Sequence, residues 1–120
     1  MGQPALELPI ERIHWTVDDV RAVILANPVV IFCRGSEDHP RCGFSERVIS
    51  VFAELGVPYS VIDVAGQAAI KAALREFSGD YRLPLVFANG QLLGGFPEIE
   101  ALAASSELGT LVRALIRNHP

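Results

Sequence analysis

The sequence predicts one α/β domain built on a small sheet, parallel in its first half and antiparallel in its second. Short apolar runs alternate with amphipathic helical segments over the first part of the chain, which is typical of βαβ units. Asn89-Gly90 then separates two further apolar runs, the strongest short-range signal of an antiparallel hairpin. The chain has 120 residues, 50% hydrophobic and 20% charged, the size and balance of a globular domain with its own core.

The helices of the first half carry recognisable start and stop signals. Thr16 and Asp19 match a capping box, and Asn27-Pro28 ends the helix that they begin. Ser45 is expected to cap the next helix, and Gly56 to end it in a left-handed conformation. The continuous β-branched and aromatic run between these helices is typical of a central strand buried on both faces. The predicted elements are a helix over 16–27, a strand over 29–33, a helix over 45–56 and a strand over 59–64.

The second half is predicted to form a helix, a hairpin and two more helical segments. Gly94-Gly95 is expected to break the second hairpin strand, and Pro97 fits the first turn of the helix that follows. Residues 1–15 show no clear period and are interpreted as a surface leader, with Ile13 and Trp15 docking on a domain that spans 16–117. The predicted elements of this half are a helix over 67–77, strands over 85–88 and 91–93, and helices over 97–103 and 108–116.

Charge and composition argue against several classes of function. Ten Lys and Arg against 14 Asp and Glu give a net charge of −4, which disfavours nucleic acid as a partner. No apolar stretch approaches the roughly 20 residues of a membrane span, and the N-terminus lacks the basic start of an export signal. We therefore expect a cytoplasmic protein, in a reducing compartment where cysteines more often serve chemistry than disulfides.

Cys42 is the candidate reactive residue. It lies between a buried strand and a helix, where unpaired backbone N–H groups and the positive end of the helix dipole stabilise an anion. The loop and helix around it carry Arg34, His39, Arg41 and Arg47, whose field is expected to lower its pKa. A low pKa gives a thiol both nucleophilicity and affinity for metals. The alternative is a buried, inert cysteine at a helix start.

The chain offers Cys42 no obvious second thiol. Position 45 holds Ser, so there is no C-x-x-C pair, and a dithiol mechanism is disfavoured. Cys33 ends an apolar strand and is expected to be a core residue instead of a resolving thiol. Two cysteines without a neighbouring Cys or His pair also argue against a tetrahedral zinc site within one chain. A lone thiolate at Cys42 therefore needs an external partner.

The segment Cys42-Gly43-Phe44-Ser45, placed after a strand and a polar loop, resembles the active-site motif of monothiol glutaredoxins. The resemblance runs collinearly from about Asn27 to Leu115. It implies a thioredoxin-like fold, a four-stranded mixed sheet flanked by helices. The other matching features are Arg34-Gly35-Ser36, Pro40, Leu55-Gly56, the Val-Ile-Asp-Val run over 61–64, Pro84, Asn89-Gly90 and Gly94-Gly95.

The resemblance also implies a ligand set. In the family, the motif cysteine attacks glutathione mixed disulfides or, as a thiolate, ligates a [2Fe-2S] cluster shared between two protomers, with two glutathione thiols completing the ligands. Cys42 is thus implied to be the catalytic thiol and the cluster ligand, and Arg34 and Lys71 to bind the glycine carboxylate of glutathione. The implied partners are iron–sulfur assembly or client proteins, and the implied states are an apo monomer and a cluster-bridged homodimer. The rest of the implied glutathione site consists of Phe44, Leu83 and Pro84, the last matching the family's cis-proline. Arg82 is expected to add a positive charge near the bound tripeptide.

Two stretches depart from the family pattern. Asp80-Tyr81-Arg82 stands where the family usually has Trp-Pro-Thr, and Phe96-Pro97 where Cys-Asp usually follows the double glycine. In the family that Asp and its backbone N–H hold the γ-glutamyl end of glutathione, and proline supplies neither. Glu98, one residue later, is a candidate to replace the carboxylate.

Three functions therefore stay open on the sequence. The first is a [2Fe-2S] carrier that uses glutathione, supported by Cys42, Arg34 and Lys71. The second is a glutathione-dependent thiol–disulfide oxidoreductase, in which Cys42 takes up a glutathionyl group and a second glutathione releases it. The third is a degenerate domain that keeps the fold for protein binding, suggested by Phe96-Pro97.

Overall fold

The computed structural model describes residues 15–40, 42–65, 67–79 and 82–120. Of the predicted leader, only Trp15 lies within these residues. Arg41, Asp80 and Tyr81 of the predicted site lie outside them. No helix in the described part of the chain is both long and apolar enough to cross a membrane. The elements are α1 (Val17–Ala26), β1 (Val29–Cys33), α2 (Gly43–Leu55), β2 (Ser60–Asp63), α3 (Ala68–Ser78), β3 (Leu85–Ala88), β4 (Gln91–Gly95), α4 (Phe96–Ala104) and α5 (Leu108–Ile116).

The four strands form one mixed sheet in the order β2-β1-β3-β4. β1 pairs parallel with β2, with Val30 opposite Ser60, and antiparallel with β3, with Val30 opposite Phe87. β3 and β4 form the antiparallel hairpin, and both residues of its turn, Asn89 and Gly90, have positive φ angles. The mixed sheet and the hairpin that the sequence predicts are confirmed.

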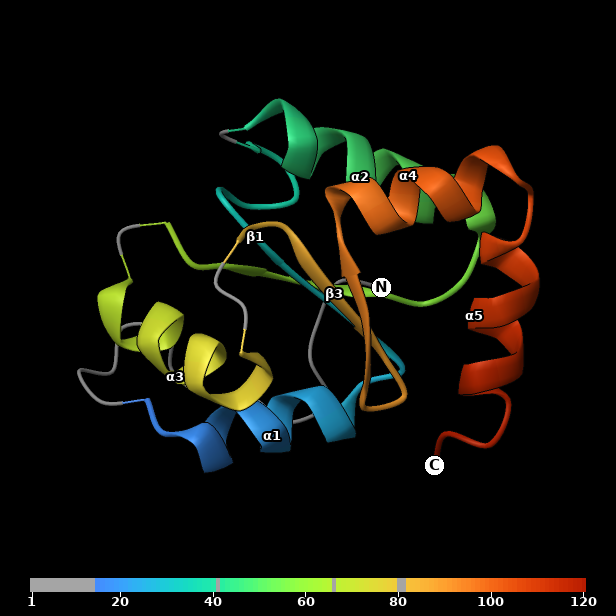
Figure 1. Ribbon diagram of the computed structural model, residues 1–120. Coiled ribbons are helices and arrows are strands. Elements are labelled where there is room, and N and C mark those ends of the chain that lie inside the picture. Colours follow the sequence, from blue (N-terminus) through green and yellow to red (C-terminus); the bar gives the residue numbers. More distant parts are fainter. Residues whose placement is uncertain (1–14, 41, 66, 80–81) are drawn as a thin grey trace.

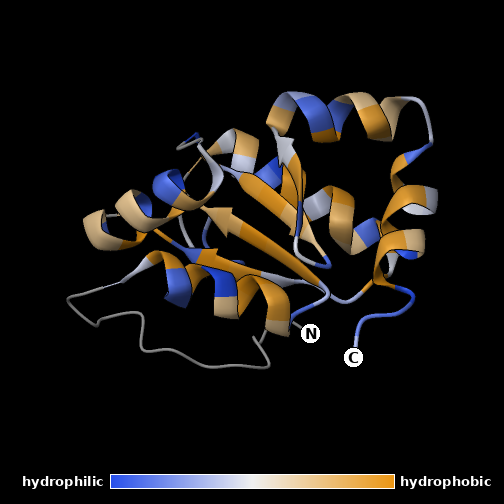
Figure 2. Ribbon diagram, turned by 60° about the horizontal axis from the view of Figure 1, so that its bottom comes forward, coloured by the Kyte–Doolittle hydropathy of each residue, from blue (hydrophilic) through white to orange (hydrophobic). Residues whose placement is uncertain are grey.

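The helices cover both faces of the sheet (Figures 1 and 2). α1 and α3 lie together on one face, and α2, α4 and α5 on the other. Successive side chains of β1 point into the two cores in turn. Val30 and Phe32 join the core under α1 and α3, whereas Val29, Ile31 and Cys33 join the core under α2, α4 and α5. All five residues of β1 are buried, which is why its apolar run shows no alternation.

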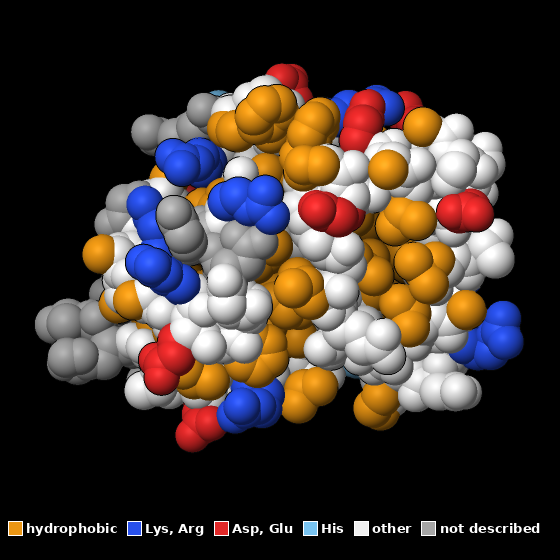
Figure 3. Space-filling model, viewed as in Figure 1, with side chains coloured by type: hydrophobic (Ala, Val, Ile, Leu, Met, Phe, Trp, Pro, Cys, Tyr) orange, Lys and Arg blue, Asp and Glu red, His pale blue; other side chains and the backbone are white. Residues whose placement is uncertain are grey.

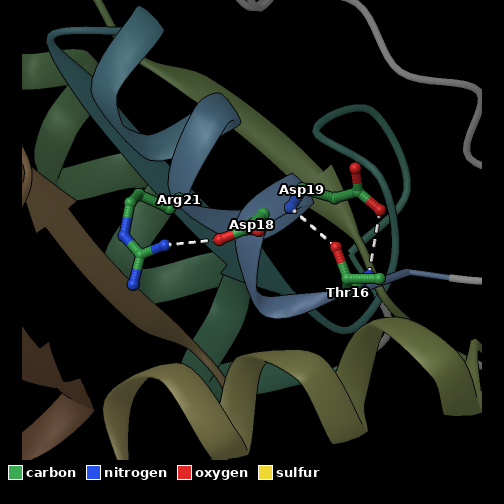
Figure 4. Close-up of polar contacts among 4 residues, drawn as sticks. All are labelled: Thr16, Asp18, Asp19 and Arg21. Carbon is green, nitrogen blue, oxygen red and sulfur yellow. Dashed lines mark hydrogen bonds and ion pairs between the residues drawn. The ribbon is translucent and has the colours of Figure 1, made fainter.

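The first helix begins as its sequence predicts (Figure 4). The backbone N–H of Asp19 donates to Oγ1 of Thr16 at 3.2 Å, and the backbone N–H of Thr16 donates to Oδ2 of Asp19 at 2.9 Å. Arg21 pairs with Asp18 at 2.7 Å on the exposed side of the same turn. Trp15 is 7% exposed and packs in the core beside α1, so its predicted docking on the domain is confirmed.

Two local predictions were wrong. Ser45 does not cap α2; Cys42 is the N-cap, and Ser45 lies fully buried in the first turn. Nor does Gly94-Gly95 break the hairpin, because these residues pair with Val86 and Leu85 and complete β4. The reason lies in Gly94, whose φ of 128° is open to glycine. That angle, next to a register shift in the ladder, bends the strand without ending it.

A thiol site at the start of helix α2

Cys42 lies where β1 and its loop lead into α2. Its backbone is extended, with φ −150° and ψ 134°, and its carbonyl accepts the hydrogen bond from the N–H of Glu46 at 2.9 Å that closes the first helical turn. Its side chain is partly exposed. The thiol therefore sits at the N-terminus of a thirteen-residue helix, beside N–H groups that have no partner within the helix.

The surroundings of Cys42 favour its thiolate. Partial burial opposes the charge, but hydrogen bonds from the backbone N–H groups of Ser45 and Phe44, the hydroxyl of Ser45 and the positive charge of Arg34 outweigh it. Together they lower the pKa of the Cys42 thiol. The direction that the sequence predicts is confirmed, but the backbone N–H groups contribute more to it than Arg34 does. Among the described residues, Arg34 is the one of the predicted basic side chains whose charge contributes.

Cys33 is the opposite kind of cysteine. It is fully buried at the end of β1, and burial raises the pKa of its thiol to about 12, although a hydrogen bond with Ser45 acts in the other direction. Cys33 thus stays a neutral thiol at ordinary pH and packs in the core, as the sequence predicts.

Ser45 connects the strand to the helix. Its Oγ accepts a hydrogen bond from the backbone N–H of Arg34 at 3.2 Å, across the end of β1. The same hydroxyl bonds to the thiol of Cys42. Ser45 therefore holds Arg34 and Cys42 in a fixed relation, a role that the sequence gives no sign of because it depends on a contact eleven residues away.

A cavity of about 640 Å³ opens beside Cys42. Six of the seven predicted site residues meet there, drawn from the loop after β1, the start of α2 and the segment before β3. Lys71, on α3, is not among the described lining residues, and its role in ligand binding stays a prediction. The Leu83–Pro84 peptide bond is cis, as the resemblance implies. The lining residues are Arg34, Cys42, Phe44, Arg82, Leu83, Pro84, Gly95, Phe96 and Pro97.

Comparisons with known proteins identify the family of the chain. The family model for glutaredoxins matches residues 29–93, from the first residue of β1 into β4. The chain belongs to the glutaredoxin family.

Several monothiol glutaredoxins are similar to it over most of their length. An uncharacterized monothiol glutaredoxin from Synechocystis sp. is 31% identical over 94 residues, which cover 78% of this chain and 88% of that protein. A probable monothiol glutaredoxin from Rickettsia typhi is 32% identical over 102 residues, covering 82% and 92%. The crystal structure of buckwheat glutaredoxin in complex with glutathione superposes with a TM-score of 0.72 at 26% identity, covering 82% and 88%. The thioredoxin-like fold that the sequence implies is confirmed.

The departures from the family pattern shape one wall of the glutaredoxin cavity. Phe96 packs on Phe44 with ring centroids 4.6 Å apart and an interplanar angle of 33°, and Pro97 lines the cavity next to them. Glu98, which the sequence offers as a replacement carboxylate, accepts a hydrogen bond at Oε1 from the backbone N–H of Gly95 at 2.8 Å. It caps its own helix and is not among the described lining residues.

A second hollow of about 540 Å³ adjoins the aromatic pair on another side. Cys42 and both phenylalanines border the two hollows, and Phe44 is 57% exposed between them. Arg47, which the sequence places in the field of the thiol, lines this second hollow and pairs with Glu100 at 3.0 Å. Figure 3 shows Lys and Arg side chains gathered at the left of one face of the molecule, close to several hydrophobic side chains.

Proposed function

We propose that this glutaredoxin binds glutathione and carries a [2Fe-2S] cluster, with Cys42 as the ligand that each chain supplies. The observation that carries the proposal is one partly exposed thiol of lowered pKa that lines a cavity together with two guanidinium groups. It rests further on the similarity to monothiol glutaredoxins.

The cavity suits glutathione by charge and shape. Glutathione is an acidic tripeptide with two carboxylates, and the guanidinium groups of Arg34 and Arg82 line the cavity. Arginine binds carboxylates through paired hydrogen bonds. The cis peptide Leu83–Pro84 precedes β3, and both of its residues line the same cavity. The similarity to a glutaredoxin crystallised with glutathione supports this part of the proposal.

The donor set fits a shared cluster. A [2Fe-2S] cluster is held by four thiolates or their equivalents. Cys42 offers one thiolate of lowered pKa, whereas Cys33 is fully buried and protonated. No group of three or more His, Cys, Asp or Glu that could hold a metal occurs among the described residues. Two chains and two glutathione thiols would complete the set, and the cluster would then be cargo for recipient iron–sulfur proteins.

Thiol–disulfide exchange is the second candidate, favoured by the low pKa of Cys42. The Cys42 thiolate attacks the glutathionyl sulfur of a mixed disulfide, the disulfide bond breaks, and the other thiolate leaves and takes a proton from water. Cys42 is then bound to glutathione through a new disulfide. A second glutathione thiolate attacks that glutathionyl sulfur, which releases glutathione disulfide and restores the Cys42 thiolate. No second protein thiol is needed.

Anaerobic reconstitution with iron, sulfide and glutathione tests the first candidate. We expect visible charge-transfer absorption and a dimer by size-exclusion chromatography, both lost in Cys42→Ser and both kept in the matched control Cys33→Ala. A colourless monomer from the wild-type chain would contradict cluster binding.

The second candidate is tested by reduction of a small glutathione mixed disulfide. We expect turnover by the wild-type chain and by Cys33→Ala, and none by Cys42→Ser. A wild-type chain that is inactive in this assay and in reconstitution would leave protein binding, the third function that the sequence keeps open.

A further inference from the structure

The cavity beside Cys42 has a charged side and an apolar side. Because the strands lie in the order β2-β1-β3-β4, the residues after β1, before β3 and after β4 line up along one end of the sheet. Arg34 follows β1 and Arg82 precedes β3, whereas α4 begins directly after β4. The wall at the β4 side consists of the side chains of Phe96 and Pro97, with Phe44 packed on Phe96.

The first turn of α4 presents no carboxylate to the cavity among the described lining residues. Pro97 has no backbone N–H, and the N–H of Gly95 already donates to Glu98 at 2.8 Å. The side chain of Glu98 is held against the strand, since a Cβ at Gly94 would lie 2.7 Å from the Cβ of Glu98. Among the described residues that line the cavity there is no Asp or Glu.

This arrangement matters for one group of glutathione, the ammonium of its γ-glutamyl end. An ammonium carries three N–H donors and a positive charge, and a site that buries it must supply acceptors or an anion. In this cavity the guanidinium groups recognise carboxylates and the apolar wall recognises apolar groups, and neither recognises an ammonium.

We propose that the cavity selects its thiol ligands by their carboxylates and not by an ammonium, so that thiols with an acylated amine bind as well as glutathione does. The inference rests on the proposed function, because it concerns the same cavity and the same thiol. The proposed substrates are anionic thiols and their disulfides, including molecules that place an apolar or N-acyl group beside Phe96 and Pro97.

Calorimetric titration of the full reduced chain tests this with two probes that cannot exchange disulfides, S-methylglutathione and N-acetyl-S-methylglutathione. We expect dissociation constants within about threefold of each other. A loss of about tenfold or more on acetylation would overturn the inference and leave the glutathione site intact. Binding of neither probe would overturn both the inference and the proposed glutathione site.

Two variants of Pro97 test whether the start of α4 determines the preference between the two probes. Pro97→Asp places a carboxylate and an N–H at the apolar wall, and we expect it to prefer the free amine over the acetylated probe by about tenfold. Pro97→Ala is the matched control, because it restores the N–H without a charge, and its two dissociation constants should stay within about threefold. An unchanged preference in Pro97→Asp would show that the start of α4 does not contact this end of the ligand and would overturn the inference.

Discussion

The carboxylate of Asp63 accepts a hydrogen bond from the backbone N–H of Gly35 at 2.9 Å, and the same oxygen accepts a second from the N–H of Ala65 at 2.9 Å. Asp63 ends β2, and Gly35 is the second residue after β1. Gly35 has a φ of 96° and bridges to Pro40 across the loop. One side chain of β2 therefore fixes the start of the loop that leads to Cys42.

We expect Asp63→Ala to lower the free energy of unfolding by about 1.5–3 kcal/mol, the range for a hydrogen bond to a charged group. Urea denaturation monitored by circular dichroism measures this loss. Asp63→Asn is the matched control, because it keeps an acceptor of the same shape, and its loss should be smaller. Equal losses in the two variants would contradict this expectation, because an uncharged acceptor of the same shape would then hold the loop no better than no acceptor at all.

The two cysteines should differ in their reaction with iodoacetamide. The lowered pKa of Cys42 means that its thiolate forms at a lower pH than that of an ordinary cysteine, so its alkylation should begin at lower pH than that of a cysteine in an unfolded peptide. Cys33 should not react in the folded chain, because it is fully buried. Mass spectrometry after timed alkylation across a pH series gives both results. Equal rates at the two cysteines would contradict the assignment of Cys42 as the reactive thiol.

Cys33 should weaken the fold at alkaline pH. Burial raises the pKa of its thiol from 9.0 to about 12, so above pH 9 the unfolded chain releases a proton that the folded chain keeps. Unfolding is then favoured as pH rises, by up to about 1.4 kcal/mol per pH unit, and below the unfolded pKa this thiol has no effect.

The measurement is the free energy of unfolding from denaturant titrations at several pH values on both sides of the unfolded pKa. Cys33→Ala should be less stable at neutral pH, because the substitution leaves a small cavity. It should also lose stability less steeply at alkaline pH. Parallel pH profiles for the two proteins would mean that Cys33 ionises in the folded chain as it does in the unfolded one.

Glu98 is expected to act on stability and not as a ligand of the cavity. Its carboxylate caps α4 through the N–H of Gly95, and loss of such a cap costs about 0.5–2 kcal/mol. Glu98→Ala should therefore lower the melting temperature, whereas Glu98→Gln, which keeps an acceptor, should lower it less. Neither should change the affinity for S-methylglutathione by more than about threefold. A larger loss of affinity in Glu98→Gln would place this carboxylate in contact with the ligand.

Local sequence signals predicted most of the fold. Thr16 and Asp19 begin α1, and the Asn89-Gly90 turn makes the hairpin, because capping and turn conformations depend on neighbours within four residues. The continuation of β4 through Gly94 was not predictable in this way. It depends on pairing with Val86, and a strand partner overrides the local preference of glycine.

The candidate site likewise combines residues that the local sequence predicts with contacts between residues far apart in the chain. Cys42 could be predicted from the order of strand, loop and helix, whereas the resemblance to monothiol glutaredoxins was needed to single out Arg34 from the other basic residues nearby. The contact of Phe44 with Phe96 and the anchoring of Gly35 by Asp63 join residues far apart in sequence, and nothing in their local pattern indicates either. The carboxylate of Glu98 shows the same limit, since its position in the sequence suggests a ligand and its contact with Gly95 makes it a cap.

The buried Ser45 limits the redox chemistry that is proposed for Cys42. A protein with two neighbouring thiols stores a pair of electrons and can complete a reduction alone, whereas Cys42 has a hydroxyl where such a thiol would stand and a protonated Cys33 in the core. In such chemistry the chain has no second reactive thiol that could store electrons. Under the proposed exchange reaction, its rate of turnover would then depend on the concentration of small thiols around it.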